Sequence, residues 1–118
     1  MIYEYKAKLS RIVDGDTLWL FVDLGFKVIV ELEFRLYGLN TPEIIGGQKV
    51  AGLFAKAELR RLLGLGELRI ATTKADKYGR WLATIFVDCP DGTTVNANQA
   101  LLDGGFAKPY FGEGPKPV

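Results

Sequence analysis

The chain has no histidine, one cysteine and one methionine among its 118 residues. The lack of histidine excludes paired-imidazole ribonuclease chemistry, histidine nucleophiles, Ser-His-Asp triads and His-ligated zinc. Cys89 has no partner in the chain, so no intrachain disulfide frames the fold. Proton transfer must therefore use carboxylates, tyrosine, lysine or water, and a metal ion must be held by oxygen.

Long apolar runs are lacking too. No segment approaches the roughly 20 apolar residues of a membrane span, and the first residues do not resemble a secretory signal. With 48% hydrophobic and 25% charged residues, the composition is that of an ordinary globular protein. We expect one domain over residues 1–118, monomeric and without a membrane partner. A cytoplasmic location fits, and a secreted mature form is the alternative.

The formal net charge of +1 argues neither for nor against a nucleic-acid partner. A basic groove can lie on a neutral protein, so the placement of charge matters more than its total.

Alternating apolar residues over the first forty positions predict three strands, at about 3–9, 18–24 and 28–36. Short turns rich in aspartate and glycine join them, which is typical of an antiparallel meander. Two more strands are predicted at 68–73 and 81–87.

Between the third and fourth strands the period becomes helical. Val50, Leu53, Phe54 and Ala57 share one apolar face, Leu62 and Leu63 extend an apolar side, and Gly64 can end the helix. Near the end of the chain, Asn96 can cap a short helix over 97–102. The tail, from about 109 to 118, is expected to be irregular because it is rich in proline and glycine.

Five strands with a helix between the third and fourth predict a mainly β fold with helices (α+β), a five-stranded OB-fold barrel with a short C-terminal helix. Such barrels present a strand face and loops to oligonucleotides. SH3-like barrels and other small β-rich folds are built from similar strands and stay open as alternatives.

The segment Asp14-Gly15-Asp16-Thr17 has two interpretations. As a structural element it is a hairpin turn, because Asp-Gly supplies the positive φ values of tight turns. As a functional element it offers the Asp16 carboxylate to a hard cation such as Ca²⁺. Asp14 would then stay outside the ligand set and hydrogen-bond ligand waters or the loop.

Arg35 and Arg80 also have two interpretations. Arg35 lies on the polar side of its strand with Glu31 and Glu33, and such surface ion pairs contribute only about 0–1 kcal/mol. Each arginine alone is best explained as a solvated surface residue. As a pair beside a carboxylate cluster they form a phosphate clamp, because guanidinium groups bind phosphate oxygens bidentately.

Several motifs occur in the order found in the staphylococcal nuclease (thermonuclease-like) family, which the chain resembles over roughly residues 8–110. They are Val13-Asp14-Gly15-Asp16-Thr17, Phe34-Arg35-Leu36, Thr41-Pro42-Glu43, Asp76-Lys77-Tyr78-Gly79-Arg80, Val95-Asn96 and Gly105-Phe106-Ala107. The resemblance implies an OB barrel with flanking helices and calcium-dependent hydrolysis of DNA or RNA.

The resemblance also implies a role for individual residues. It assigns calcium to Asp16, Asn40 and the Thr41 carbonyl, catalysis to Arg35, Glu43 and Arg80, and substrate binding to Lys77, Tyr78 and Tyr110, with Phe111 as the alternative to Tyr110. The plain alternative for Thr41-Pro42-Glu43 is a helix start, with Thr41 as N-cap. The family usually has aspartate where Asn40 stands, so weaker calcium binding is predicted, because affinity depends on ligand charge.

The sequence thus predicts a calcium-dependent nuclease that acts on single-stranded or locally opened DNA or RNA. The alternative is a catalytically weak or inactive OB-fold module that binds nucleic acid or a protein, which Asn40 favours. The presence of Asp16, Arg35, Glu43 and Arg80 together favours the enzyme. That interpretation requires the four side chains to share one pocket.

Overall fold

The computed structural model of the chain describes residues 3–44, 46–75 and 79–111. Its elements, in chain order, are β1 (Tyr3–Asp14), β2 (Thr17–Asp23), β3 (Ile29–Leu36), β4 (Leu39–Asn40), the short 3₁₀ helix η1 (Gly46–Gln48), α1 (Lys49–Leu63), β5 (Glu67–Ala75), β6 (Trp81–Asp88), β7 (Thr94–Asn96), α2 (Ala97–Asp103) and β8 (Lys108–Pro109). No helix in this described part is both long and apolar enough to cross a membrane.

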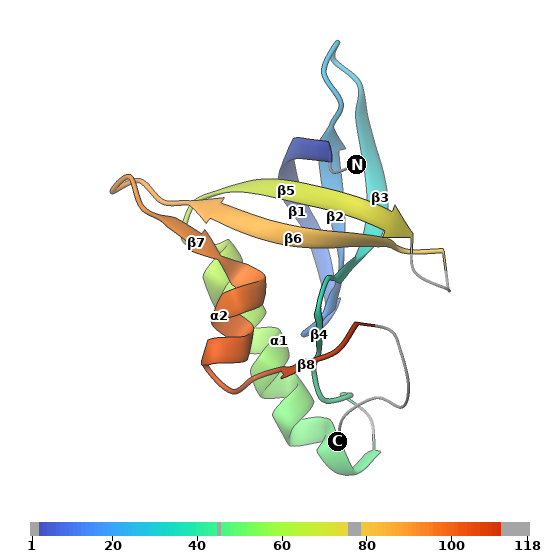
Figure 1. Ribbon diagram of the computed structural model, residues 1–118, viewed down its shortest axis with the longest axis vertical. Helices are drawn as coiled ribbons and strands as arrows, with labels where there is room; N and C mark the ends of the chain where they lie inside the picture. Colours follow the sequence, from blue (N-terminus) through green and yellow to red (C-terminus); the bar gives the residue numbers. More distant parts are fainter. Residues whose placement is uncertain (1–2, 45, 76–78, 112–118) are drawn as a thin grey trace.

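Five strands close into a mixed barrel of the OB type, which confirms the predicted fold. The strand order is β3-β2-β1-β5-β6, and parallel pairing of β3 with β6 closes the barrel. β7 extends the sheet beside β6, and β4 pairs with β8 in a separate two-stranded sheet. Figure 1 shows α1 and α2 together at one end of the barrel, with β4 and β8 beside them.

The core follows the predicted alternation of the strands. On β2 the side chains of Leu18, Leu20 and Val22 are at most 2% exposed, whereas Phe21 between them is 42% exposed. Burying such a side chain contributes roughly 1.5–3 kcal/mol relative to leaving it in water. The pattern therefore fixes which face of β2 points into the barrel.

Helix α1 lies where the sequence predicts it, and Leu62 and Leu63 are buried as predicted, but the apolar face predicted for its first half is wrong. Val50, Leu53 and Phe54 are 68%, 46% and 63% exposed, and Ala57 is exposed too. The buried side is formed instead by Gly52, Ala55, Leu59, Leu62 and Leu63. A Cβ atom on Gly52 would lie only 2.6 Å from the Glu43 carbonyl oxygen. Over its first half the helix approaches its neighbours so closely that the small residues Gly52 and Ala55 must face them, whereas leucines fill the wider space over its second half.

The turn between β1 and β2 is confirmed, but the reason given for its glycine is wrong. Asp14 pairs with Thr17 across the turn, yet Gly15 is not among the glycines with positive φ. A Cβ atom there would lie 2.7 Å from the Ala55 Cβ and 2.9 Å from the Thr41 side chain. Glycine is required at position 15 because the turn packs tightly between α1 and the segment after β4, which leaves no space for a Cβ atom.

The C-terminal part is more regular than predicted. Asn96 caps α2 as expected, since its side-chain oxygen accepts a hydrogen bond from the Gln99 N–H at 3.0 Å. Lys108 and Pro109, however, form β8 and pair with Asn40 and Leu39. Of the tail predicted to be irregular, Pro109 lies in β8, Tyr110 and Phe111 belong to no helix or strand, and residues 112–118 lie outside the described part.

Candidate active site

A cavity of about 430 Å³ lies where β1 turns into β2. Its lining consists of Val13, Asp14, Asp16, Thr17, Arg35, Asn40, Thr41, Glu43, Ile44, Lys56 and Arg80. All six residues that the sequence assigns to catalysis or metal binding are among them. The spatial requirement of the nuclease interpretation is therefore met, because Glu43 faces the same cavity as Asp16 and both arginines.

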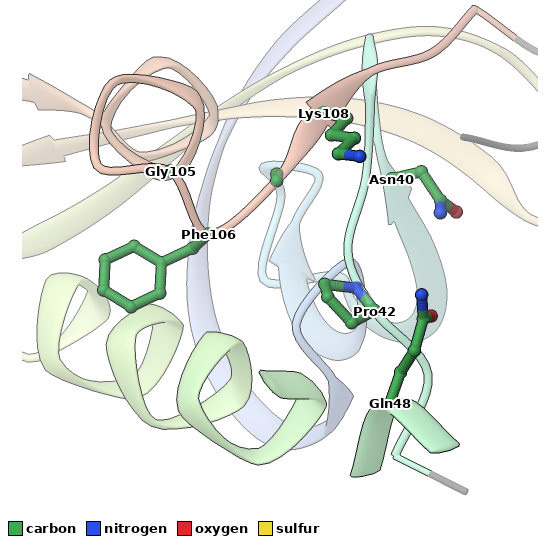
Figure 2. Close-up of a pocket in the computed structure, with 7 residues that line it drawn as sticks. Asn40, Pro42, Gln48, Gly105, Phe106 and Lys108 are labelled. Atoms are coloured by element: carbon green, nitrogen blue, oxygen red, sulfur yellow. The ribbon is translucent and has the colours of Figure 1, made fainter. Parts of the chain in front are cut away.

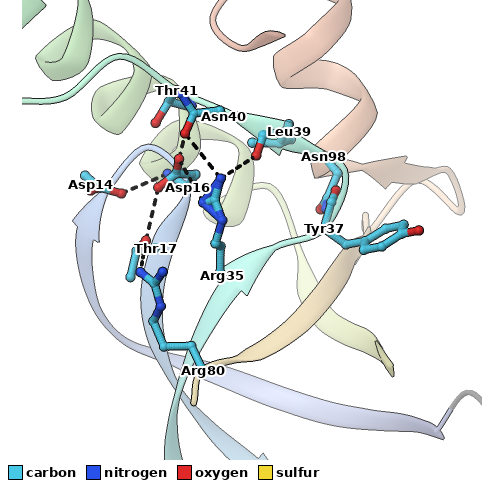
Figure 3. Close-up of polar contacts among 10 residues, drawn as sticks. All are labelled: Asp14, Asp16, Thr17, Arg35, Tyr37, Leu39, Asn40, Thr41, Arg80 and Asn98. Carbon is cyan, nitrogen blue, oxygen red and sulfur yellow. Dashed lines mark hydrogen bonds and ion pairs between the residues drawn. The ribbon is translucent and has the colours of Figure 1, made fainter. Parts of the chain in front are cut away.

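Asp16 is the buried anion of this cavity, with 6% of its surface exposed. Its Oδ1 accepts a hydrogen bond from the Thr17 hydroxyl at 3.0 Å, and its Oδ2 accepts one from the Thr41 N–H at 3.1 Å (Figure 3). Burial acts to raise the pKa of Asp16, but the hydrogen bond with Asp14, the charge of Arg35 and the Thr41 N–H hold it below its usual value. Asp16 is therefore ionised at neutral pH.

Asp14 behaves in the opposite way. Its Oδ1 accepts a hydrogen bond from the Asp16 N–H at 3.1 Å. Burial, followed by the hydrogen bond with Asp16 and the negative charge of Asp16, raises the pKa of Asp14 to about 7. Without a metal ion, the two neighbouring carboxyl groups thus titrate as a pair in which Asp14 keeps its proton longer.

Arg35 is not the solvated surface residue of the plain interpretation, because only 7% of it is exposed. Its Nη2 donates to the Leu39 carbonyl at 3.0 Å and to the Asn40 Oδ1 at 3.2 Å, and its Nη1 lies 3.4 Å from the Asp16 Oδ2. The guanidinium group therefore joins the first turn of the barrel to β4. It holds the Asp16 and Asn40 side chains on one side of the cavity.

Arg80 reaches the cavity from the start of β6. Its Nη1 donates to the Thr17 hydroxyl at 3.4 Å, and that hydroxyl in turn donates to Asp16 (Figure 3). Thr17 thus connects Arg80 to the buried carboxylate, a role that the sequence did not reveal. The two arginines enter from β3 and β6, the strands whose parallel pairing closes the barrel.

The alternative interpretation of Thr41-Pro42-Glu43 as a helix start is wrong, since α1 begins only at Lys49. These residues form a connecting segment that packs on Gly52 of α1 through the carbonyls of Pro42 and Glu43. The close backbone contact fixes the position of Glu43 at the cavity.

Lys56 is a cavity residue that sequence reasoning missed. It follows Ala55, the α1 residue in contact with the β1–β2 turn. Correct assignment of the small residues as the inner face of α1 would have placed Lys56 beside the cavity. Asn98 was missed as well. Its Nδ2 donates to the Tyr37 carbonyl (Figure 3) and to the Ala83 carbonyl, both at 3.0 Å, and these hydrogen bonds tie α2 to the barrel.

The predicted substrate-binding residues are only partly described. Lys77 and Tyr78 lie outside the described residues. The Tyr110 ring lies 5.7 Å from the Arg35 guanidinium carbon, so Tyr110 is adjacent to the cavity. Phe111 instead packs edge-on against Tyr37. Of the two aromatic alternatives, Tyr110 is the one in contact with a site residue.

A smaller hollow of about 60 Å³ shares Asn40 with the main cavity. Figure 2 shows Pro42 and Gln48 on one side of it and Lys108 of β8 on the other. Neither a carboxylate nor an arginine lines it. The larger cavity is therefore the candidate active site.

The donors in the larger cavity fit a hard cation such as calcium. Asp16, Asn40 and Thr41 offer carboxylate, amide and peptide or hydroxyl oxygens, the ligand types that calcium prefers. The buried Thr41 hydroxyl oxygen has no hydrogen-bond partner among the described residues, so a polar atom there is still to be satisfied. The described residues contain no group of three or more His, Cys, Asp or Glu side chains that could hold a metal. Amide and backbone oxygens must therefore contribute to any such site.

An OB-type barrel with arginines and carboxylates around a single cavity defines a class of protein suited to bind a phosphodiester. Residues 33–117 match the family model for staphylococcal nuclease homologues, and the chain belongs to this family. It is 31% identical to an uncharacterized protein of Methanocaldococcus jannaschii, with 91% of this chain and 60% of that protein covered. It is 26% identical to an endonuclease of Bacillus subtilis, with 92% of this chain but only 9% of that protein covered. The chain thus spans less than two thirds of either relative.

Proposed function

We propose that this chain is a calcium-dependent nuclease that hydrolyses phosphodiester bonds of DNA or RNA, in single strands or locally opened duplexes. Membership of the nuclease-homologue family supports the reaction class. The observation that carries the proposal is the common cavity of Asp16, Arg35, Glu43 and Arg80. Its volume of about 430 Å³ admits one phosphodiester with part of its neighbouring sugars.

In this proposal Glu43 positions the attacking water and accepts its proton. The water oxygen bonds to phosphorus in line with the ester bond that breaks, and the leaving oxygen takes up a proton from solvent water. Arg35 and Arg80 hold non-bridging oxygens and neutralise the negative charge that develops there. Arg80, which directly precedes β6 and lines the cavity, is the arginine that we assign to the leaving oxygen.

Asp16, Asn40 and Thr41 would hold the calcium ion. A bound calcium ion supplies Lewis-acid stabilisation and a template for the phosphate oxygens. Because Asn40 is neutral, the site has one negative charge fewer than a site with two aspartates, and we infer that it binds calcium more weakly.

A second candidate function is a nucleic-acid-binding or protein-binding module without catalysis. The neutral Asn40, hydrogen-bonded to Arg35 at 3.2 Å, favours it. The isosteric substitution Glu43→Gln distinguishes the enzyme from the binding module. The enzyme requires DNA cleavage that depends on calcium, stops with a chelator, and falls at least about 100-fold in Glu43→Gln.

Glu58→Gln is the matched control, because Glu58 lies on α1 and pairs with Arg61 instead of lining the cavity. Thermal unfolding of both variants is measured in parallel to check that each keeps the fold. Tight nucleic-acid binding without cleavage in any metal would establish the module instead. Cleavage that survives Glu43→Gln would refute the assigned role of Glu43.

A further inference from the structure

The outward face of the β1–β2 hairpin continues directly from the candidate active site. Thr17 and Arg35, which line the cavity, are cross-strand partners on β2 and β3. Because side chains alternate along a strand, Trp19 and Phe21 lie on the same face of β2 as Thr17. Successive layers on this face follow each other at about 6.8 Å.

Thr17 itself lies opposite Asp14, but each layer beyond it places a basic residue of β1 opposite a residue of β2. Arg11 is the partner of Trp19, Lys8 of Phe21, and Lys6 of Asp23. The Arg11 guanidinium carbon lies 5.2 Å from the centre of the Trp19 ring. Aromatic and cationic side chains therefore alternate along a face that starts at the cavity.

The three cations of this face are available to a ligand. Lys6, Lys8 and Arg11 are exposed, and none of them forms an ion pair with a residue that the structure describes. Arg69, on the neighbouring strand β5, is by contrast paired with Glu4 and Asp88. The charge of Arg69 is thus compensated by ion pairs, whereas Lys6, Lys8 and Arg11 have no such partner among the described residues.

The far layers also border a hollow. A groove of about 560 Å³ is lined by Lys6, Lys8, Phe21 and Asp23, among others. Phe21 is 42% exposed at its edge. The face therefore carries a concave surface at its far end as well as the catalytic cavity at its near end.

Acidic residues limit the face on its other side. Glu33 and Glu31 of β3 are the partners of Trp19 and Phe21. A polyanion is repelled from β3 and attracted to β1, which confines it to the β1–β2 side.

We propose that Arg11, Trp19, Lys8, Phe21 and Lys6 form a track that binds single-stranded nucleic acid flanking the bond in the cavity. The proposal rests on the proposed function, and it adds where the rest of the substrate lies. Its grounds are charge complementarity and continuity with the cavity. Single-strand-binding proteins combine a cationic groove for the backbone with aromatic rings on which bases stack, and bases also stack on guanidinium planes.

The test compares the affinity for a thymidine 12-mer with the affinity for a thymidine dinucleotide, which is long enough to occupy the cavity but not the track. Binding is measured in calcium with the Glu43→Gln protein, so that nothing is cleaved. Adding Lys8→Ala and Arg11→Ala should lower the ratio of 12-mer to dinucleotide affinity about tenfold. The slope of log affinity against log salt for the 12-mer should fall by about 1.4, or 0.7 for each lost phosphate contact.

Two controls sharpen this test. Arg60→Ala with Arg61→Ala removes the same charge from the last turn of α1 and should leave the ratio unchanged. Glu33→Gln removes a repelling charge and should raise the ratio. The proposed track would be refuted by an unchanged ratio of 12-mer to dinucleotide affinity in the Lys8 and Arg11 variant. An equal fall of this ratio in the α1 control would refute it too.

Stacking has its own readout. The chain has two tryptophans, so Trp81→Phe leaves Trp19 as the only one. Quenching of its fluorescence by the 12-mer but not by the dinucleotide supports the track, and no quenching by either contradicts it. Failure of the nuclease proposal is seen separately, as a lack of cleavage by the unmodified protein, and the 12-mer binding still decides the track.

Discussion

Replacement of Gly52 by alanine should separate activity from stability in this protein. Gly52 is the point where α1 touches the segment that carries Glu43. An added Cβ atom would lie 2.6 Å from the Glu43 carbonyl oxygen and 2.8 Å from the Pro42 carbonyl oxygen. The shorter distance is 0.8 Å less than the 3.4 Å at which ordinary contact begins. Both neighbours are backbone atoms, so the segment itself must move.

The cost in stability is modest because two effects oppose each other. Overpacking costs about 1–3 kcal/mol, and alanine is better than glycine inside a helix by roughly 1 kcal/mol. The net loss is therefore about 0–2 kcal/mol. In the proposed mechanism, however, a shift of nearly 1 Å in Glu43 lowers the rate on the order of 100-fold. We expect a folded variant with about 1% of the activity.

The assay is calcium-dependent cleavage of a short oligonucleotide, with thermal unfolding measured in parallel. Gly47→Ala is the matched control, because a Cβ atom on Gly47 meets nothing within 4 Å. It should keep full activity. Full activity in Gly52→Ala would refute the reasoning, and so would an equal loss in the two variants.

Three further predictions concern the cavity. Asn40→Asp should raise calcium affinity roughly tenfold, since it adds a charged ligand; calorimetry measures this, and no change would exclude Asn40 as a ligand. In chelator, stability should fall as pH rises from about 4 to the pKa of Asp14 at about 7, because the folded state then binds more protons than the unfolded state. Thermal unfolding of Asp14→Asn should lack this slope. Lys56→Gln should weaken binding of uncleaved DNA about tenfold by removing a phosphate-attracting charge from the cavity, and unchanged binding would remove Lys56 from the site.

The barrel could be predicted from the sequence because strand alternation is a local signal. The alternation of apolar residues within one strand indicates which of its sides faces the core. Leu18, Leu20 and Val22 are buried as this pattern predicts. The order of the motifs along the chain, and its resemblance to a family, then supplied the residues of the cavity. Neither step required knowledge of distances.

The inner face of α1 could not be predicted in the same way. The rule that large apolar residues face inward selected Val50, Leu53 and Phe54, whereas backbone proximity at Gly52 and Ala55 decided the orientation. Close approach of two segments is a property of the tertiary structure. In the sequence it is indicated only by small residues at the positions in contact. The same limit explains why Lys56 and the role of Gly15 were missed.

The charges around the cavity bear on how metal and substrate would bind. Its described lining holds three carboxyl groups and three cations, namely Asp14, Asp16, Glu43, Arg35, Lys56 and Arg80. With the pKa of Asp14 raised to about 7, the lining does not carry the excess of negative charge that a divalent cation needs. A phosphate oxygen of a bound substrate would supply that charge, and a cation held by Asp16, Asn40 and Thr41 would offset the charge of the phosphate. In the proposed site each ligand should therefore raise the affinity of the other by the same factor, and we expect calcium binding to depend on substrate because Asn40 is neutral.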